Sequence, residues 1–150
     1  GDVVYLWQNG ELNEANAASC PKTVAALANA PLARIPGHSP SVLFSRMPPG
    51  SHVAPRNGPT NTRLQVHLPL VVPGKCRLRV GNEVREWQTG RAWVFDDSMD
   101  HEAWNDSDQA RVLLQFDIAR PELTADENRW VVTLLEGIDA FPGQKFEWNV

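Results

Sequence analysis

Residues 95–118, FDDSMDHEAWNDSDQARVLLQFDI, contain two stretches with strand character separated by turn-forming residues. His101 opens the first stretch, Arg111 opens the second, and the run from Asn105 to Gln109 supplies the turn. The pattern predicts a hairpin whose arms lie side by side, so that His101 and Arg111 point into one cavity. A neutral imidazole there can ligate a transition metal, and a guanidinium can hold a carboxylate through two parallel hydrogen bonds. The spacing alone is also compatible with a histidine and an arginine that only make the strands soluble and form no site.

Short strand-like segments continue upstream of this hairpin, separated by Gly, Pro or Asn turns such as Pro73-Gly74 and Gly81-Asn82. Antiparallel strands in this number predict an all-β core of two facing sheets or a jelly-roll barrel. The expected strands are residues 42–47, 51–54, 63–72, 76–80, 83–88, 91–95, 101–104 and 111–118.

Helical patterns flank the predicted β core. Residues 1–20 are expected to form an edge strand and a loop, and residues 21–30, which begin with proline, are expected to form a short helix. Thr124 is followed three residues later by glutamate, which is a capping-box pattern, and apolar residues then recur at helical spacing. We therefore expect a helix over 125–139 that covers one face of the barrel, and a tail, 141–150, that docks on it.

Length and composition predict a single domain, residues 1–150. The formal charge of -4 argues against nucleic acid or an anionic membrane as the main partner. No apolar run approaches the roughly 20 residues that span a bilayer, and the first residues lack a signal pattern, so we expect a soluble, cytoplasmic protein. Cys20 and Cys76 are compatible with one disulfide, although we favour two free thiols.

Alternation along residues 63–70 predicts which side chains face the interior. One face carries Leu64, Val66, Leu68 and Leu70, and the other carries Arg63, Gln65, His67 and Pro69. If the apolar face lies beneath helices, the polar face looks into the barrel, where a small charged cofactor would sit. His67 is therefore a candidate inward donor, although an isolated inward histidine can instead satisfy a buried carbonyl.

The segment from Phe95 to Leu123 closely resembles the C-terminal half of the aspartyl/asparaginyl beta-hydroxylase family of iron(II), 2-oxoglutarate-dependent oxygenases. The resemblance implies a double-stranded β-helix, a jelly-roll, cupin-like fold with a short N-terminal and a C-terminal α-helix packed on it. It implies that His101 ligates iron and that Arg111 binds the distal carboxylate of 2-oxoglutarate. His67, in the run HLPLVVP, matches the family histidine that hydrogen-bonds 2-oxoglutarate, and two further residues match the lining of its pocket, Ser45 and Met47.

Arg56 is the main departure from the family pattern. The first iron ligand of the family is the histidine of a P-H-x-G-x-T-N motif, whereas this chain reads PRNGPTN from Pro55, with Gly58 where other oxygenases carry a carboxylate ligand. A guanidinium offers no lone pair. A unit positive charge about 4 Å from a divalent cation costs roughly 8 kcal/mol at an effective dielectric near 20. His52, the only spare histidine nearby, is about 13 Å away along an extended strand, and Gln65 replaces a family arginine.

Two functions follow from these residues. The first is a 2-oxoglutarate-dependent oxygenase of the beta-hydroxylase type that acts on a small molecule or peptide with a carboxylate or amide, with iron(II) at a degraded site on His101. The second is a metal-free homologue in which Arg56 and Arg111 bind a carboxylate ligand or a protein partner. The first function is favoured because this chain keeps all four residues that match the family pocket: Ser45, His67, His101 and Arg111. Arg56 favours the second function.

Overall fold

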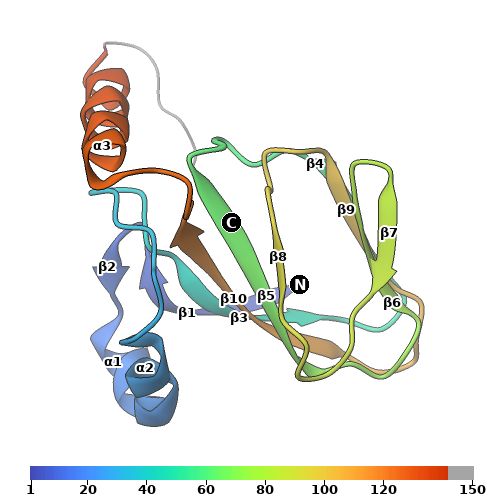
Figure 1. The fold of residues 1–150 in the computed structure, drawn as a ribbon. Helices are drawn as coiled ribbons and strands as arrows, with labels where there is room; N and C mark the ends of the chain where they lie inside the picture. The colour runs from blue at the N-terminus through green and yellow to red at the C-terminus, as the bar shows by residue number, and fades with distance from the viewer. Residues whose placement is uncertain (142–150) are drawn as a thin grey trace.

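Two antiparallel sheets face each other in the computed structural model, which describes residues 1–141 (Figure 1). The six-stranded sheet has the order β2 (Glu11–Leu12), β1 (Asp2–Gln8), β3 (Val42–Met47), β10 (Arg111–Ala119), β5 (Arg63–Val71) and β8 (Trp93–Phe95). The four-stranded sheet has the order β4 (Ser51–Arg56), β9 (His101–Asn105), β6 (Cys76–Val80) and β7 (Glu83–Glu86). This arrangement confirms the predicted jelly-roll core.

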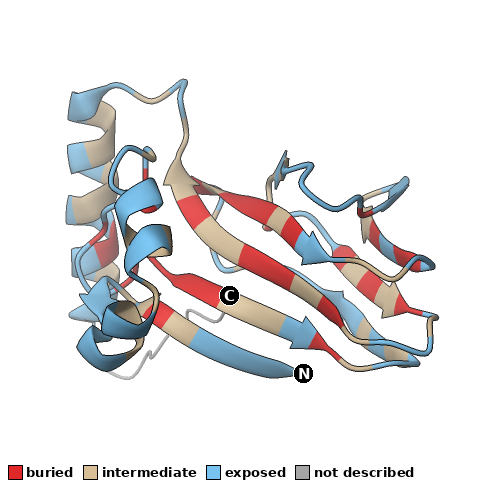
Figure 2. Cartoon of the chain, turned by 90° about the horizontal axis from the view of Figure 1, so that it is seen from below, coloured by how far each residue is buried: buried red, intermediate tan, exposed pale blue. Residues whose placement is uncertain are grey.

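Side chains from both sheets fill the space between them. Met47 and Leu113 of the six-stranded sheet belong to one apolar cluster with Cys76, Leu78 and Ala103 of the four-stranded sheet. Burying such side chains between two sheets is the main stabilising contribution that a sandwich has. Figure 2 shows that the buried residues run along the strands, whereas the helices are mostly exposed.

A second apolar cluster covers the outer face of the six-stranded sheet beside the N-terminal helices. There Leu27 of helix α2 (Pro21–Leu27) packs with Leu6 and Leu114, and Leu68 of β5 lies against this cluster. On the same strand Arg63, Gln65 and His67 are buried on the other face. The predicted assignment of the two faces of residues 63–70 is therefore confirmed.

The region before β3 contains more helix than predicted. Helix α1 (Glu14–Ser19) occupies part of the expected loop, and α2 ends at Leu27 rather than at residue 30. Asn13 caps α1 because its side chain accepts a hydrogen bond from the N–H of Asn16 at 3.0 Å. Cys20 and Cys76 are both free, as predicted.

Helix α3 (Ala125–Asp139) has the predicted bounds and the predicted capping box between Thr124 and Glu127. It does not cover a sheet face, so that part of the prediction is wrong. The helix lies beside the loop 59–62, with Asp139 bonded to His38, and Leu135 is its only buried residue. The prediction for the tail falls, apart from Phe141, outside the described residues. Within residues 1–141, no helix has the length and apolar character that crossing a membrane requires.

Candidate functional site

A cavity of about 200 Å³, here called the inner pocket, lies between the two sheets. Its apolar walls include Leu78, Trp87 and Phe95. Its polar lining consists of Ser45, Arg56, Gln65, His67, Asp97, His101, Glu102, Arg111 and Gln115. A larger hollow of about 480 Å³ has walls from β7 and β8 and shares Leu78 and Phe95 with the inner pocket.

Arg111 is the most constrained charge in the inner pocket. Arg111 is 4% exposed. Its Nη2 donates a hydrogen bond to Ser45 Oγ at 3.2 Å, and its Cζ lies 4.4 Å from the centre of the Trp87 ring. Its Nε has no hydrogen-bond partner, and no ion pair links Arg111 to a carboxylate in residues 1–141. Burial lowers the pKa of this guanidinium to about 10. A buried cation without a counter-ion is costly, and an anionic ligand would remove that cost.

His67 is a neutral hydrogen-bond donor in the same pocket. Its Nε2 accepts a hydrogen bond from Gln115 Nε2 at 2.9 Å, which places the ring proton on Nδ1. That Nδ1 is buried and has no partner. Burial, followed by the charges of Arg111, His101 and Arg56, holds the pKa of His67 well below its usual value. His67 is therefore a neutral imidazole in the pocket lining, and its Nδ1–H is a buried donor.

His101 lies on β9 with the tautomer that metal ligation requires. Its Nδ1 donates to the carbonyl oxygen of Met99 at 2.9 Å, which leaves the Nε2 lone pair available. The ring packs against Phe95, with ring centres 6.0 Å apart. In the register of the sheet His101 is paired with Arg56 on β4 and with Val80 on β6.

The route by which His101 and Arg111 reach one pocket differs from the prediction. Strand β9 pairs with β4 and β6, and β10 pairs with β3 and β5, so the two strands are not arms of one hairpin. The chain instead crosses from one sheet to the other after Asn105. The amide of Asn105 holds this crossing, because it donates to the carbonyl oxygens of Met47, Pro48 and Gln109. The two side chains still line the same cavity, from facing sheets.

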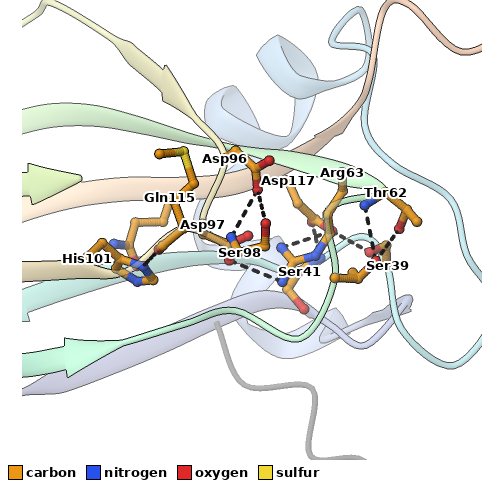
Figure 3. Close-up of polar contacts among 12 residues, drawn as sticks. Ser39, Ser41, Thr62, Arg63, Asp96, Asp97, Ser98, His101, Gln115 and Asp117 are labelled. Carbon is orange, nitrogen blue, oxygen red and sulfur yellow. Dashed lines mark hydrogen bonds and ion pairs between the residues drawn. The ribbon is translucent and has the colours of Figure 1, made fainter. Parts of the chain in front are cut away.

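Asp97 is a polar residue of the pocket lining that the sequence analysis did not single out. Its neighbour Asp96 serves a turn, because it accepts hydrogen bonds from the N–H and the hydroxyl of Ser98. Asp97 is 4% exposed and pairs with Arg63 at 3.4 Å (Figure 3). Burial raises the pKa of the Asp97 carboxyl, and the charge of Arg63 opposes this. A Cβ atom on Gly58 would lie 2.6 Å from the Asp97 carboxylate, so the missing side chain at residue 58 makes room for it.

The remaining predicted residues divide between the pocket and other places. Ser45 lines the pocket and Arg56 is an exposed residue at its wall. Met47 belongs to the apolar cluster between the sheets and is not among the residues that line the pocket. His52 is also outside the pocket lining. Its ring forms a hydrogen bond with Glu102 at 2.8 Å and stacks on Trp104.

These features define a class of protein, a jelly-roll barrel with a ligand pocket between its sheets. The cupin domain of Schizosaccharomyces pombe Cnp3 has a similar fold, with a TM-score of 0.50 and 14% identity over 71% of this chain and 65% of that chain. A model of the family described as Aspartyl/Asparaginyl beta-hydroxylase matches residues 2–121, and the chain belongs to this family.

Relatives in this family include proteins named as hydroxylases. The chain is 41% identical over 126 residues to "Aspartyl/asparaginyl beta-hydroxylase" of Mus musculus, which covers 83% of this chain and 17% of the mouse protein. It is 42% identical over 120 residues to "Ornithine lipid ester-linked acyl 2-hydroxylase" of Rhizobium tropici, which covers 78% of this chain and 41% of that protein. The chain thus spans less than half the length of these relatives.

The pocket residues fit 2-oxoglutarate better than they fit iron. Arg111 Nε and His67 Nδ1 are buried donors without partners, which suits a carboxylate-bearing ligand. For iron, His101 offers a lone pair, but Arg56 stands opposite it. Residues 1–141 contain no group of three or more His, Cys, Asp or Glu side chains that could hold a metal ion. The donor set for iron is therefore incomplete, and iron binding stays a prediction.

Proposed function

We propose that this chain is a beta-hydroxylase-type oxygenase domain whose inner pocket binds 2-oxoglutarate. The observation that carries the proposal is Arg111, a buried guanidinium in a cavity wall that has no carboxylate partner among residues 1–141. Relatives named as hydroxylases support the oxygenase class. The molecule that it hydroxylates is proposed to carry an acidic or amide group.

Each pocket residue has a separate role in this proposal. Arg111 and Ser45 bind the distal carboxylate, and the indole of Trp87 holds the guanidinium in place through its ring face. His67 donates its Nδ1 proton to the other end of the ligand. Iron(II) at His101 would supply the oxygen-activating chemistry, and the incomplete donor set predicts that it is retained poorly.

A second function is favoured by one observation, the position of Arg56. It lines the pocket from the four-stranded sheet, opposite His101, while Arg111 lines it from the six-stranded sheet. Two guanidiniums on facing sheets suit a small dicarboxylate without any metal. In this second proposal the chain is a metal-free member of the family that binds a carboxylate ligand or a partner protein.

Binding of 2-oxoglutarate in the presence of EDTA, measured by calorimetry, tests what the two functions share. The unmodified chain is expected to bind, and Arg111→Met is expected to bind at least about 100-fold more weakly, because two hydrogen bonds to a charged group are worth about 3 kcal/mol together. Arg46→Met is the matched control, since Arg46 is an exposed β3 arginine outside the pocket lining. Equal binding by the unmodified chain and Arg111→Met would contradict the proposal.

An anaerobic titration with iron(II) and 2-oxoglutarate separates the two functions. The visible charge-transfer band of the complex is the readout. A band in the unmodified chain that strengthens in Arg56→His supports the oxygenase. A band that appears only in Arg56→His decides for the metal-free function.

A further inference from the structure

Helix α3 lies outside the part of the chain that matches the family model, which ends at residue 121. In Figure 1 the helix stands at one side of the barrel, and its only buried residue is Leu135. None of its residues belongs to the lining of the inner pocket. The helix is therefore an addition to the barrel that neither the core between the sheets nor the carboxylate site uses.

Large apolar side chains form an exposed stripe along α3. Trp130 is 68% exposed, Leu134 is 64% exposed, and Phe141, two residues after the end of the helix, is 64% exposed. Together with Gly137 they are spaced by four, three and four positions. This is the heptad spacing that places side chains on one face of a helix and forms the seam of a coiled coil. We call this set, Trp130, Leu134, Gly137 and Phe141, the α3 stripe.

Gly137 interrupts the α3 stripe at a position where the folded chain does not require glycine. After proline, glycine is the residue least favoured in a helix interior, and a Cβ atom on Gly137 would meet nothing within 4 Å. The missing side chain leaves a surface hollow of about 440 Å³. Its lining is Thr133, Leu134, Gly137, Ile138 and Phe141. The hollow can therefore receive an aliphatic side chain from another molecule.

The charge of α3 favours a protein over a lipid surface as the partner. Helices that lie on membranes carry lysine and arginine on the polar face, which anionic lipids attract. Residues 125–139 contain four acidic residues and one basic residue: Asp126, Glu127, Arg129, Glu136 and Asp139. An anionic membrane would repel this helix, so the α3 stripe is better suited to another apolar protein surface.

The exposed area of the α3 stripe is that of a weak protein interface. An aromatic side chain buries about 150–250 Å², so the exposed two-thirds of Trp130 and of Phe141 amount to roughly 100–170 Å² each. With Leu134 the stripe offers roughly 300–450 Å², the size of an apolar patch that is often functional. Standard interfaces bury about 800 Å² per partner, and transient ones bury less than about 600 Å². The area therefore suits a reversible complex.

We propose that the α3 stripe forms a homodimer in which a second copy of the chain packs its own stripe in the antiparallel direction. Leu134 then enters the hollow at Gly137 of the partner subunit. In the same register Trp130 packs against Phe141 of the partner subunit, and the two-fold axis repeats both pairs. A parallel pair would instead place the two hollows at Gly137 against each other and leave both unfilled. The dimer does not depend on the carboxylate-binding function.

Sedimentation equilibrium of the full chain measures the association. Between about 1 μM and about 1 mM chain, the weight-average mass is expected to rise from that of one chain toward that of two. Trp130→Glu is expected to weaken the association at least about 30-fold, which is the scale of an interface hot spot. Glu136→Leu, which adds an apolar side chain at an exposed position of α3 outside the stripe, is the control and should leave the association unchanged.

A pair of size changes tests the antiparallel register. Gly137→Leu sets leucine against leucine and is expected to weaken self-association at least about 10-fold, although the single chain has room for the added side chain. Leu134→Ala leaves the hollow unfilled and is expected to weaken self-association by about the same factor. A mixture of the two variants is expected to form a heterodimer tighter than either homodimer, because each pair then contains one leucine and one small residue.

A chain that remains monomeric up to about 1 mM overturns the proposal, and the α3 stripe would then be covered by residues 142–150 or by a different protein. Self-association that Trp130→Glu leaves unchanged, or that Gly137→Leu strengthens, also overturns it. Binding of 2-oxoglutarate in EDTA is a separate readout, and Trp130→Glu should not change it because α3 lies outside the inner pocket lining. Failure of the dimer and failure of the carboxylate site are thus distinguishable.

Discussion

Arg111→Met is expected to make the ligand-free protein more stable while removing ligand binding. Burial lowers the pKa of Arg111 from its ordinary value to about 10. Each pKa unit is worth about 1.4 kcal/mol, so the buried charge costs about 3 kcal/mol at neutral pH. The hydrogen bond to Ser45 and the contact with the Trp87 ring offset about 1 kcal/mol each. Methionine keeps the aliphatic packing of the arginine side chain. Because the cost of the buried charge exceeds the two offsets by about 1 kcal/mol, the free energy of unfolding of Arg111→Met should rise by about that amount.

The pH dependence of this effect has a definite sign. The folded-state pKa of Arg111 lies below its unfolded value, so the penalty is complete below about pH 10 and disappears as the pH rises from there to the ordinary pKa of arginine. The gain from Arg111→Met should therefore be constant across neutral pH.

Urea unfolding with and without 2-oxoglutarate, in EDTA, measures both consequences. A ligand that binds only the folded state at 100 times its Kd raises the free energy of unfolding by about 2.7 kcal/mol. The unmodified chain should show this increase and Arg111→Met should not. A ligand-free Arg111→Met variant that is less stable than the unmodified chain by about 2 kcal/mol or more, the size of a typical destabilising substitution, would contradict this prediction. Arg111 would then be a structural cation that the protein itself satisfies.

Three further outcomes follow from the structure. Leu113→Ala should lower the free energy of unfolding by about 2–5 kcal/mol in urea, because Leu113 is 0% exposed between the sheets; a loss below about 1 kcal/mol would contradict that packing. Thr124→Ala should destabilise α3 by about 1 kcal/mol, seen as faster amide exchange in that helix, since it removes the capping box. Burial raises the pKa of both Asp97 and Asp117, so their contribution to stability is complete below the ordinary carboxyl pKa and is lost as the pH rises through the raised value. Unfolding measured from about pH 4 to 8 should therefore show a smaller decline with rising pH in Asp117→Asn than in the unmodified chain, and equal slopes would disprove the effect.

The strands could be predicted more readily than their partners. Alternation and turn residues gave the bounds of β3 and β6 as the structure has them, because both signals are local. The expected hairpin between β9 and β10 failed because no local signal says whether a turn returns within a sheet or crosses to the facing one. The deciding residue is Asn105, whose amide binds three carbonyl oxygens that come together only in the folded barrel.

The site was predicted in part, and the missed residue has an identifiable signal. His67 could be placed inside from alternation along β5, and resemblance pointed to His101 and Arg111. Asp96 and Asp97 are adjacent residues after β8, and alternation sends neighbouring side chains to opposite sides. That pattern alone could have placed one of the two inside. What it could not give was the fit between the Asp97 carboxylate and Gly58, since these residues are far apart in sequence.

The charge balance of the barrel interior separates carboxylate binding from iron. Arg63 lies between two buried carboxylates, Asp97 and Asp117, so this cation already has carboxylate partners. Arg111 has no such partner in the part of the chain that the structure describes, and Arg56 adds a second positive charge at the same pocket. The pocket around Arg111 is therefore stabilised by an anion whether or not His101 holds a metal. A family member that lost iron while keeping Arg111 would still gain stability from a carboxylate ligand, which is why the binding of 2-oxoglutarate in EDTA has to be measured before the oxygenase reaction is assayed.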